Sequence, residues 1–257
     1  RGIEAATHDL IAVLDAGVRL QPDWLRHIVG PLRAGSADVV AGFFEADPRT
    51  SFEMALGATT LPSVEEIAPD TFLPSSRSVA FTREAWRRAG GYPEWLDYCE
   101  DLIFDLRLRA DPDVRVVFEP RATVRFRPRP SLRAFVRQYY HYARGDGKAN
   151  LWPRRHVTRY LAYAYLAAMV GCWAWPAPRR HGALVSALRM LTAAGAAWYV
   201  ARPVRRLVGR WGAAPVPERV RMLALVPVLR VAGDLAKMAG YPVGWSWRLK
   251  HSPPPWR

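Results

Sequence analysis

The stretch from Asp9 to Gly17 constrains the fold most. It reads Asp-Leu-Ile-Ala-Val-Leu-Asp-Ala-Gly, with five consecutive apolar residues between two acids. Such a run is typical of a strand that is buried on both faces of a parallel sheet. Open α/β sheets bind ligands beyond the carboxyl ends of their strands, which is where Asp15 falls. The stretch therefore predicts a carboxylate facing a crevice, although an ordinary turn aspartate explains Asp15 equally well.

Strand and helix patterns alternate through the next hundred residues. Helices are expected over residues 25–32, 51–60 and 83–89 and from Glu100 onward. Strands are expected over residues 38–44, 78–82, 114–118 and 122–126. The segment 61–75 contains three prolines and mixed acids, so we expect a loop long enough to be functional. This alternation indicates an α/β domain.

The charge of the chain changes abruptly near Asn150. The 257 residues carry a formal net charge of +14. Residues 1–150 hold 20 Lys and Arg against 21 Asp and Glu, whereas residues 151–257 hold 17 against 2. We therefore predict two domains, 1–150 and 151–257, with different partners. The chain opens at Arg1 within what reads as the end of a helix, and we expect an upstream portion.

Several site classes have no support in the sequence. The two cysteines, Cys99 and Cys172, are too few for a disulfide framework and suit a reducing compartment. No His or Cys pair has the spacing of zinc ligands, and there is no Gly-rich phosphate loop or nucleophile elbow.

A second group of acids is Glu100-Asp101, at the predicted start of a helix. A helix N-terminus favours negative charge, so simple capping explains the pair in isolation. Asp15 ends a strand, whereas Asp101 begins a helix after the Gly90-Gly91 turn. The two carboxylates can therefore face one crevice.

Four segments in this order resemble the inverting glycosyltransferases of family 2, which have the GT-A fold. The resemblance lies in Asp9–Leu25 with its Pro-Asp-Trp-Leu, in Ser75–Thr82, in Gly90–Pro93 and in Glu100–Arg109. It implies a GT-A-like, Rossmann-like, mostly parallel sheet with flanking helices over residues 1–150. It also implies that the nucleotide-binding portion of the domain precedes Arg1.

The resemblance implies a role for each matching residue. Asp101 is the general base that deprotonates the acceptor hydroxyl, and Glu100 is its catalytic neighbour. The donor contacts implied are Asp15, Ala16, Gly17, Ser76 and Arg77. A nucleoside diphosphate leaving group needs its growing negative charge neutralised, for which Mg²⁺ or Mn²⁺ held by Asp15 is expected.

One residue departs from the family pattern. The motif reads Asp15-Ala16-Gly17, so the last acid, the usual protein ligand of the metal, is missing. Either Asp15 and water hold the ion, or another carboxylate replaces the missing one, or the dependence on metal is weak. A catalytically silent relative is also compatible with this change.

The segment 131–148 contains a further partial match. Gln138 occupies the position of the QxxRW segment in processive family members, but His141 and Tyr142 replace the Arg and Trp. This argues against a synthase of long chains. Gln138 and Arg144 are expected to contact the donor diphosphate, unless the aromatic helix merely packs on the sheet or at a membrane.

The basic region combines long apolar runs with arginines. The runs 157–175 and 183–200 approach the length that spans a bilayer, but Arg159 and Arg189 interrupt them. Arg179 and Arg180 lie between the runs, and tryptophans, including Trp175, lie near their ends. We expect a membrane hairpin and an interfacial basic helix on anionic lipid, with a soluble helical bundle as the alternative. Nucleic acid is not expected as a partner, because the arginines punctuate apolar runs.

These observations predict a membrane-associated inverting glycosyltransferase. It transfers a sugar from a nucleotide-sugar donor to a lipid-linked or cell-envelope glycan acceptor. We expect it at the inner membrane, with the catalytic domain in the cytoplasm. The alternatives are a catalytically silent partner in glycan assembly and a basic lipid- or nucleic-acid-binding protein without catalysis.

Overall fold

The computed structural model describes residues 2–174 and 182–256. The chain forms two compact units, each described by itself below. The first contains Arg1–Gly57, Leu61–Pro130 and Ser252–Arg257, and the second contains Ala58–Thr60 and Ser131–His251. The change in charge at Asn150 therefore falls inside the second unit.

The first unit is built on a five-stranded sheet with the order β1-β4-β3-β5-β2. Among the described residues only β3 and β5 pair in parallel, whereas the β1–β4, β3–β4 and β2–β5 pairs are antiparallel. The prediction of a mostly parallel sheet is therefore wrong, and the sheet is mixed. The strands are β1 (Leu10–Val13), β2 (Arg19–Leu20), β3 (Val39–Ala46), β4 (Val79–Thr82) and β5 (Val116–Phe126).

The strand β1 lies at the edge of this sheet. Among the described residues it pairs with β4 alone, from Leu10 opposite Thr82 to Val13 opposite Val79. Ile11 is its one buried residue, and Leu14, just beyond its end, is 38 % exposed. The prediction of a strand buried on both faces is therefore wrong for this stretch, because Ala12 and Leu14, which share one face of the strand, are exposed.

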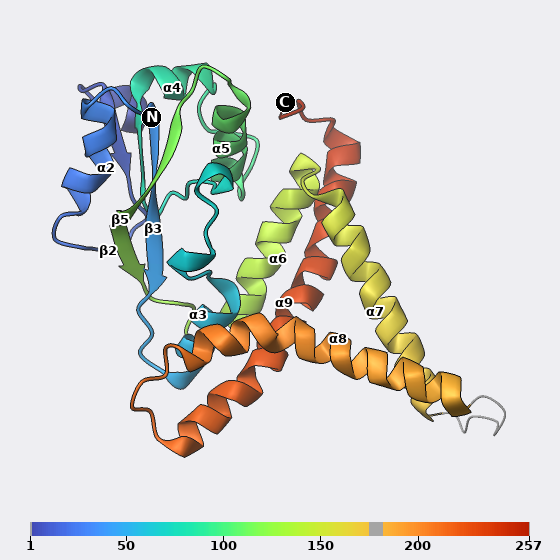
Figure 1. The fold of residues 1–257 in the computed structure, drawn as a ribbon. Coiled ribbons are helices and arrows are strands. Elements are labelled where there is room, and N and C mark those ends of the chain that lie inside the picture. The colour runs from blue at the N-terminus through green and yellow to red at the C-terminus, as the bar shows by residue number, and fades with distance from the viewer. Residues whose placement is uncertain (1, 175–181, 257) are drawn as a thin grey trace. The chain divides into compact units, whose positions relative to one another are not determined.

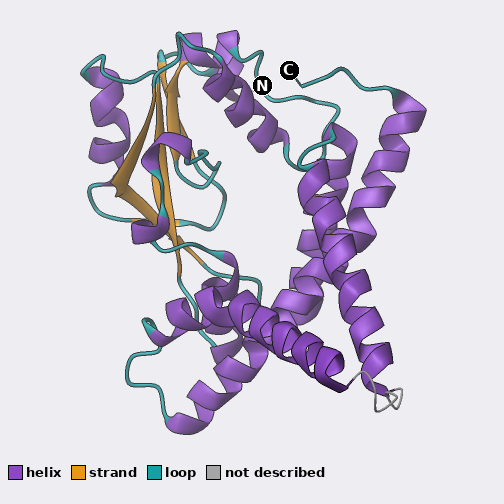
Figure 2. Ribbon diagram, turned by 45° about the vertical axis from the view of Figure 1, so that its right-hand side comes forward, coloured by secondary structure: helices purple, strands orange, loops and turns teal. Residues whose placement is uncertain are grey.

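Helices cover both faces of the sheet (Figure 1 and Figure 2). Helix α2 (Trp24–Arg33) packs on the face that includes Val40, and α4 (Arg83–Arg88) and α5 (Glu100–Ala110) pack on the face that includes Val39. Neighbouring residues of β3 thus enter different cores, as the alternation of a strand requires. Two further helices are α1 (Gly2–Ala5) and α3 (Ser51–Thr60).

A β-bulge interrupts the register between β3 and β5 at Gly42 and Phe43. A Cβ on Gly42 would overlap the Ser78 hydroxyl and the Ala122 carbonyl, so this position requires glycine. Ser78 accepts a hydrogen bond from the Trp24 indole at 2.9 Å and donates to the Ala122 carbonyl at 2.8 Å. The bulge lets β5 run on as one strand where two were expected.

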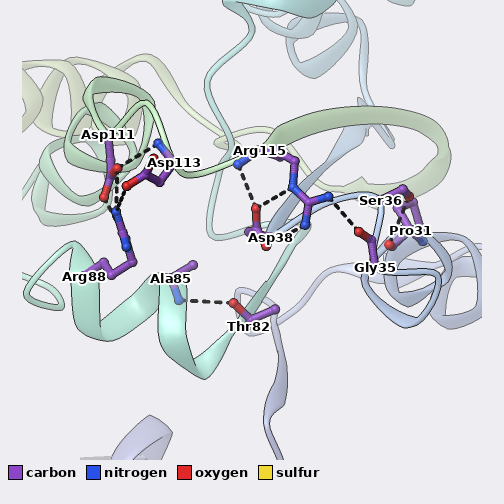
Figure 3. Close-up of polar contacts among 10 residues, drawn as sticks. All are labelled: Pro31, Gly35, Ser36, Asp38, Thr82, Ala85, Arg88, Asp111, Asp113 and Arg115. Atoms are coloured by element: carbon purple, nitrogen blue, oxygen red, sulfur yellow. Dashed lines mark hydrogen bonds and ion pairs between the residues drawn. The ribbon is translucent and has the colours of Figure 1, made fainter.

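Ion pairs tie the elements together at one end of the sheet (Figure 3). Arg88 on α4 donates to Asp111 at 2.9 Å and to Asp113 at 2.8 Å, beyond the end of α5. Arg115, just before β5, donates to Asp38, just before β3, at 3.0 Å. Asp15 follows β1 and therefore lies at the other end of the strands.

The segment between α3 and β4 is an ordered connection. It contains two short 3₁₀ helices, η1 (Val64–Glu66) and η2 (Pro69–Thr71). Arg109 of α5 donates to the carbonyls of Pro69, Asp70 and Phe72 at 3.3, 2.5 and 2.6 Å. The helix that begins with Glu100-Asp101 therefore also fixes this loop.

The second unit consists of helices packed through small residues. They are α6 (Leu132–Ala149), α7 (Pro153–Ala174), α8 (Gly182–Val208) and α9 (Val216–His251). Helices α6 and α9 lie side by side, and a Cβ on Gly240 or Gly244 would overlap backbone atoms of α6 (Figure 1). Glycine at these positions therefore permits the close approach of the two helices.

Asp234 of α9 connects three helices of this unit. It accepts a hydrogen bond from Arg159 of α7 at 2.9 Å and a short one from Tyr199 of α8. Arg230 stacks over the Tyr199 ring at 4.1 Å. The arginine that interrupts the first apolar run is thus neutralised inside the unit.

The expected hairpin corresponds to α7 and α8, and it stays a prediction. Its connection, including Trp175, Arg179 and Arg180, lies outside the described residues. Within residues 2–174 and 182–256, no helix combines the length and the hydropathy needed to cross a membrane.

Candidate active site

A tight turn just before β4 stands at the centre of the candidate site. The amide of Ser78 donates to the Ser75 carbonyl at 2.9 Å, which leaves Ser76 and Arg77 at the two central positions. The Ser75 hydroxyl accepts from the Arg77 amide at 3.4 Å and from its guanidinium at 3.2 Å. Two consecutive side chains are therefore held at the end of the strands where Asp15 lies.

Arg77 faces Asp15. Its Nε lies 3.8 Å from the Asp15 Oδ2, and its guanidinium stacks over Phe126 at 4.5 Å and Phe44 at 5.3 Å. The Asp15 side chain is 47 % exposed, whereas that of Arg77 is 23 % exposed. Stacking on the two aromatic rings thus holds the guanidinium in place, whereas the Asp15 carboxylate remains accessible to solvent.

Ser76 faces Asp101 at the first turn of α5. The Ser76 hydroxyl donates to Asp101 Oδ2 at 3.4 Å, and the Leu102 amide donates to Oδ1 at 2.8 Å. Cys99, the residue before the helix, has φ of 67°, a left-handed conformation that turns the chain into α5. The turn thereby connects the two acids that the sequence singles out: Asp101 through Ser76, and Asp15 through Arg77.

Glu100 belongs to the same electrostatic environment. Burial raises its pKa, and the negative charges of Asp101, Asp97 and Asp15 add to the rise. A carboxyl with a raised pKa, close to other acids in an α/β domain, is a feature of functional sites.

Two residues of this environment were not expected from the sequence. Tyr92 packs its ring 4.7 Å from that of Phe104 on α5, and Asp105 lies one helical turn beyond Asp101 and is 3 % exposed. Burial, followed by the charge of Asp101, raises the pKa of Asp105 well above its usual value. The spacing of Asp101 and Asp105 places both on one helix face, and this was the available signal for Asp105.

The other residues predicted to contact the donor lie in two different parts of the chain. Ala16 and Gly17 are exposed in the turn after β1, where Gly17 has φ of 86°. Gln138 and Arg144 lie on α6 of the second unit, where Gln138 donates to the Tyr142 hydroxyl at 2.7 Å. Contact of Gln138 and Arg144 with a diphosphate stays a prediction.

The residues present permit one mode of binding a divalent cation. Among the described residues, no group of three or more His, Cys, Asp and Glu side chains is arranged to hold a metal ion. Mg²⁺ bound with phosphates usually takes one or two carboxylates and otherwise water and phosphate oxygens. The open carboxylate of Asp15 fits a cation whose other ligands come from a bound diphosphate.

One family model matches most of the chain. A family model described as glycosyl transferase family 21 matches residues 1–232. A search of curated proteins found no match. Among solved structures, the chain is similar to a mannosyltransferase from Pyrobaculum calidifontis in complex with GDP-Man and Mn²⁺. The identity is 16 % over 98 % of this chain and 65 % of that chain, with a TM-score of 0.37, so the chain spans less than two thirds of that protein.

Proposed function

Because the chain belongs to glycosyltransferase family 21, we propose that it transfers a sugar from a nucleotide-sugar donor with inversion at the anomeric carbon. The motifs resemble family 2, whereas the matching model is that of family 21, and glycosyl transfer is common to both. The observation that carries the proposal is the turn at Ser76 and Arg77, which contacts Asp101 on one side and Asp15 on the other.

Asp101 acts as the general base in this proposal. A lone pair of the acceptor hydroxyl forms the new bond to the anomeric carbon. The bond from that carbon to the diphosphate oxygen breaks, and its electron pair leaves with the nucleoside diphosphate. The hydroxyl proton passes to the Asp101 carboxylate, and a single displacement of this kind inverts the anomeric configuration.

Arg77 and Asp15 act on the leaving group. The guanidinium presents several N–H donors in a fixed plane, which suits the oxygens of a diphosphate. Asp15 is the residue that would hold Mg²⁺ or Mn²⁺ together with the donor, and such a cation would neutralise the charge that develops on the diphosphate. Glu100 lies beside Asp101 and contacts the acceptor.

Two features of the second unit support the proposal that it associates with an anionic membrane. A lipid-linked or cell-envelope acceptor would be reached from that membrane. Large apolar side chains are exposed on its helices, including Leu161 at 66 %, Met190 at 67 % and Trp198 at 82 %. Residues 151–257 carry 17 basic side chains against 2 acids, which suits anionic headgroups. We place this surface on the inner membrane, with the catalytic unit in the cytoplasm.

The test is turnover of labelled nucleotide sugars by the full-length protein. UDP-, GDP- and dTDP-sugars are each incubated with the protein, a lipid extract and Mg²⁺ or Mn²⁺, and the anomeric configuration of the product is read by NMR. Transfer with inversion supports the proposal. An absence of turnover with every donor in a folded, membrane-bound protein favours the silent partner in glycan assembly.

A further inference from the structure

Helix α5 holds the segment that leads into the turn before β4. Near the end of this helix, the Arg109 guanidinium donates to the carbonyls of Asp70 at 2.5 Å, Phe72 at 2.6 Å and Pro69 at 3.3 Å. Its Nε is buried and has no hydrogen-bond partner among the described residues. All three hydrogen bonds of the guanidinium therefore go to one segment, residues 69–72.

The ring of Phe72 connects this segment to the arginine of the candidate site. It lies 4.7 Å from the Phe118 ring and 6.3 Å from the Phe44 ring, both within the range of favourable aromatic pairs. The Arg77 guanidinium lies over Phe44, at 5.3 Å from the centre of that ring. Because the chain also runs directly from Phe72 into the turn, the segment reaches Arg77 both through packing and through the backbone.

The same helix contacts the turn from its other end. Asp101, in the first turn of α5, accepts a hydrogen bond from Ser76 at 3.4 Å. At a rise of 1.5 Å per residue, Asp101 and Arg109 are about 12 Å apart along the helix axis. The Arg109 contacts with Asp70 and Phe72 are much shorter than the bond to Ser76. Arg109 is thus the stronger of the two attachments between α5 and the chain around the turn.

We propose that Arg109 is a positioning residue for the nucleotide-sugar donor: by holding Phe72 and the turn, it keeps Arg77 in place for the diphosphate. This inference rests on the proposed function and adds to it a residue that itself touches no substrate. A guanidinium that is already in place loses less conformational freedom when it binds a diphosphate, so the effect falls on the affinity for the donor.

Steady-state kinetics of Arg109→Met test this inference. Methionine has a helix propensity close to that of arginine but donates no hydrogen bond. Because three hydrogen bonds to the segment are lost, we expect the KM for the nucleotide sugar to rise about five- to tenfold, with kcat within about twofold of the parent. Arg109→Lys keeps the charge and a donor but lacks the planar fork, and it should raise KM about two- to threefold.

A double-mutant cycle shows whether Arg109 acts through Arg77. In an Arg77→Lys background the stacked guanidinium is already lost, so adding Arg109→Met should raise KM by less than about twofold further. Amide hydrogen exchange gives a readout that does not depend on activity. Residues 69–78 should exchange faster in Arg109→Met, whereas residues 24–33 of α2 should keep the parental rate.

The matched control is Arg115→Met. Arg115 also makes several side-chain hydrogen bonds, to Asp38 at 3.0 and 3.1 Å and to the Gly35 carbonyl at 2.7 Å. These contacts lie at the opposite end of the strands from the turn before β4. This variant should lower the melting temperature and leave the KM for the donor unchanged.

The outcomes separate this inference from the proposed function. The positioning role is overturned by an unchanged donor KM in an active Arg109→Met, by an equal rise in Arg115→Met, or by a full additional rise in the Arg77→Lys background. Unchanged exchange of residues 69–78 in Arg109→Met overturns it as well. A parent protein that transfers no sugar overturns the proposed function, and the role of Arg109 toward the donor falls with it.

Discussion

Arg77 Nε lies 3.8 Å from Asp15 Oδ2, while the guanidinium of Arg77 stacks over Phe126 at 4.5 Å. The contact joins the turn before β4 to the turn after β1, two neighbouring antiparallel strands. At 3.8 Å it is an ion pair and exceeds the length of a hydrogen bond, so the N–H donors of Arg77 are not saturated by Asp15. A diphosphate can therefore bind N–H groups of Arg77 other than the one that donates to the Ser75 hydroxyl at 3.2 Å.

We predict that Arg77→Lys raises the KM for the nucleotide sugar about tenfold, because lysine loses the planar fork and the stacking on Phe126. Steady-state kinetics with varied donor provide the measurement. Arg121→Lys, at an ion pair in which the arginine is 69 % exposed and Glu119 is 11 % exposed, is the matched control and leaves KM unchanged. Equal effects of the two variants would contradict a donor contact for Arg77.

The packing of α6 on α9 depends on glycine. In Gly244→Ala the new Cβ meets the backbone of Arg144 and Lys148, so the helices must separate. We expect a loss of about 1–3 kcal/mol in the free energy of unfolding, measured by urea denaturation. Gly195→Ala on α8 is the control, because a Cβ there has no neighbour within 4 Å. That variant gains up to about 1 kcal/mol from helix propensity, and a similar loss in both variants would refute the close-packing account.

Glu53 makes the stability of the first unit dependent on pH. Burial opposes its ionisation, but Arg127 at 2.7 Å and the Arg49 amide outweigh burial, and the pKa of Glu53 is lowered below 4.5. Because the folded-state pKa is the lower one, its contribution to stability is full above pH 4.5. It is lost as the pH falls through the folded-state value. We expect Glu53→Gln to flatten the decline of the urea midpoint below pH 4.5, whereas Glu94→Gln, at an exposed position, keeps the parent profile.

Vesicle flotation tests the proposed membrane surface. The parent protein should float with vesicles of phosphatidylcholine and phosphatidylglycerol, and less with phosphatidylcholine alone, because its second unit is strongly basic. Trp198→Ser removes a side chain that is 82 % exposed and should weaken flotation. Leu25→Ser, at 58 % exposure in the first unit, should not. Equal flotation with both lipid mixtures would argue against an anionic partner.

Local sequence patterns predicted most of the helices and singled out Asp15 and Asp101 as candidate site residues. Residues 51–60 form α3 as expected, and Glu100 begins α5. The direction of the strands was not predicted, because an apolar run such as residues 10–14 carries no information about its neighbours. The continuous β5 was missed for a similar reason, since residues 120–122 form a bulge within it that only the pairing with β3 reveals.

In the candidate site, too, the sequence pointed to some residues and missed others. Asp15 and Asp101 stand out because each lies at the end of a recognisable element. Tyr92 and Asp105 do not, because their environment arises only when the turn at Ser76 meets α5. Gly17, which departs from the family motif, can be recognised from the sequence alone. Activity assays with and without Mg²⁺ or Mn²⁺ show whether this glycine weakens the dependence on metal.

The central claim is that Asp101 accepts the proton of the acceptor hydroxyl. Its most direct test is the rate of glycosyl transfer by Asp101→Asn, which keeps the shape of the side chain and one acceptor oxygen but removes its basicity. We predict a loss of about 10²–10⁴-fold in kcat with the melting temperature and donor binding retained. Transfer at the parental rate by the folded variant would contradict the account.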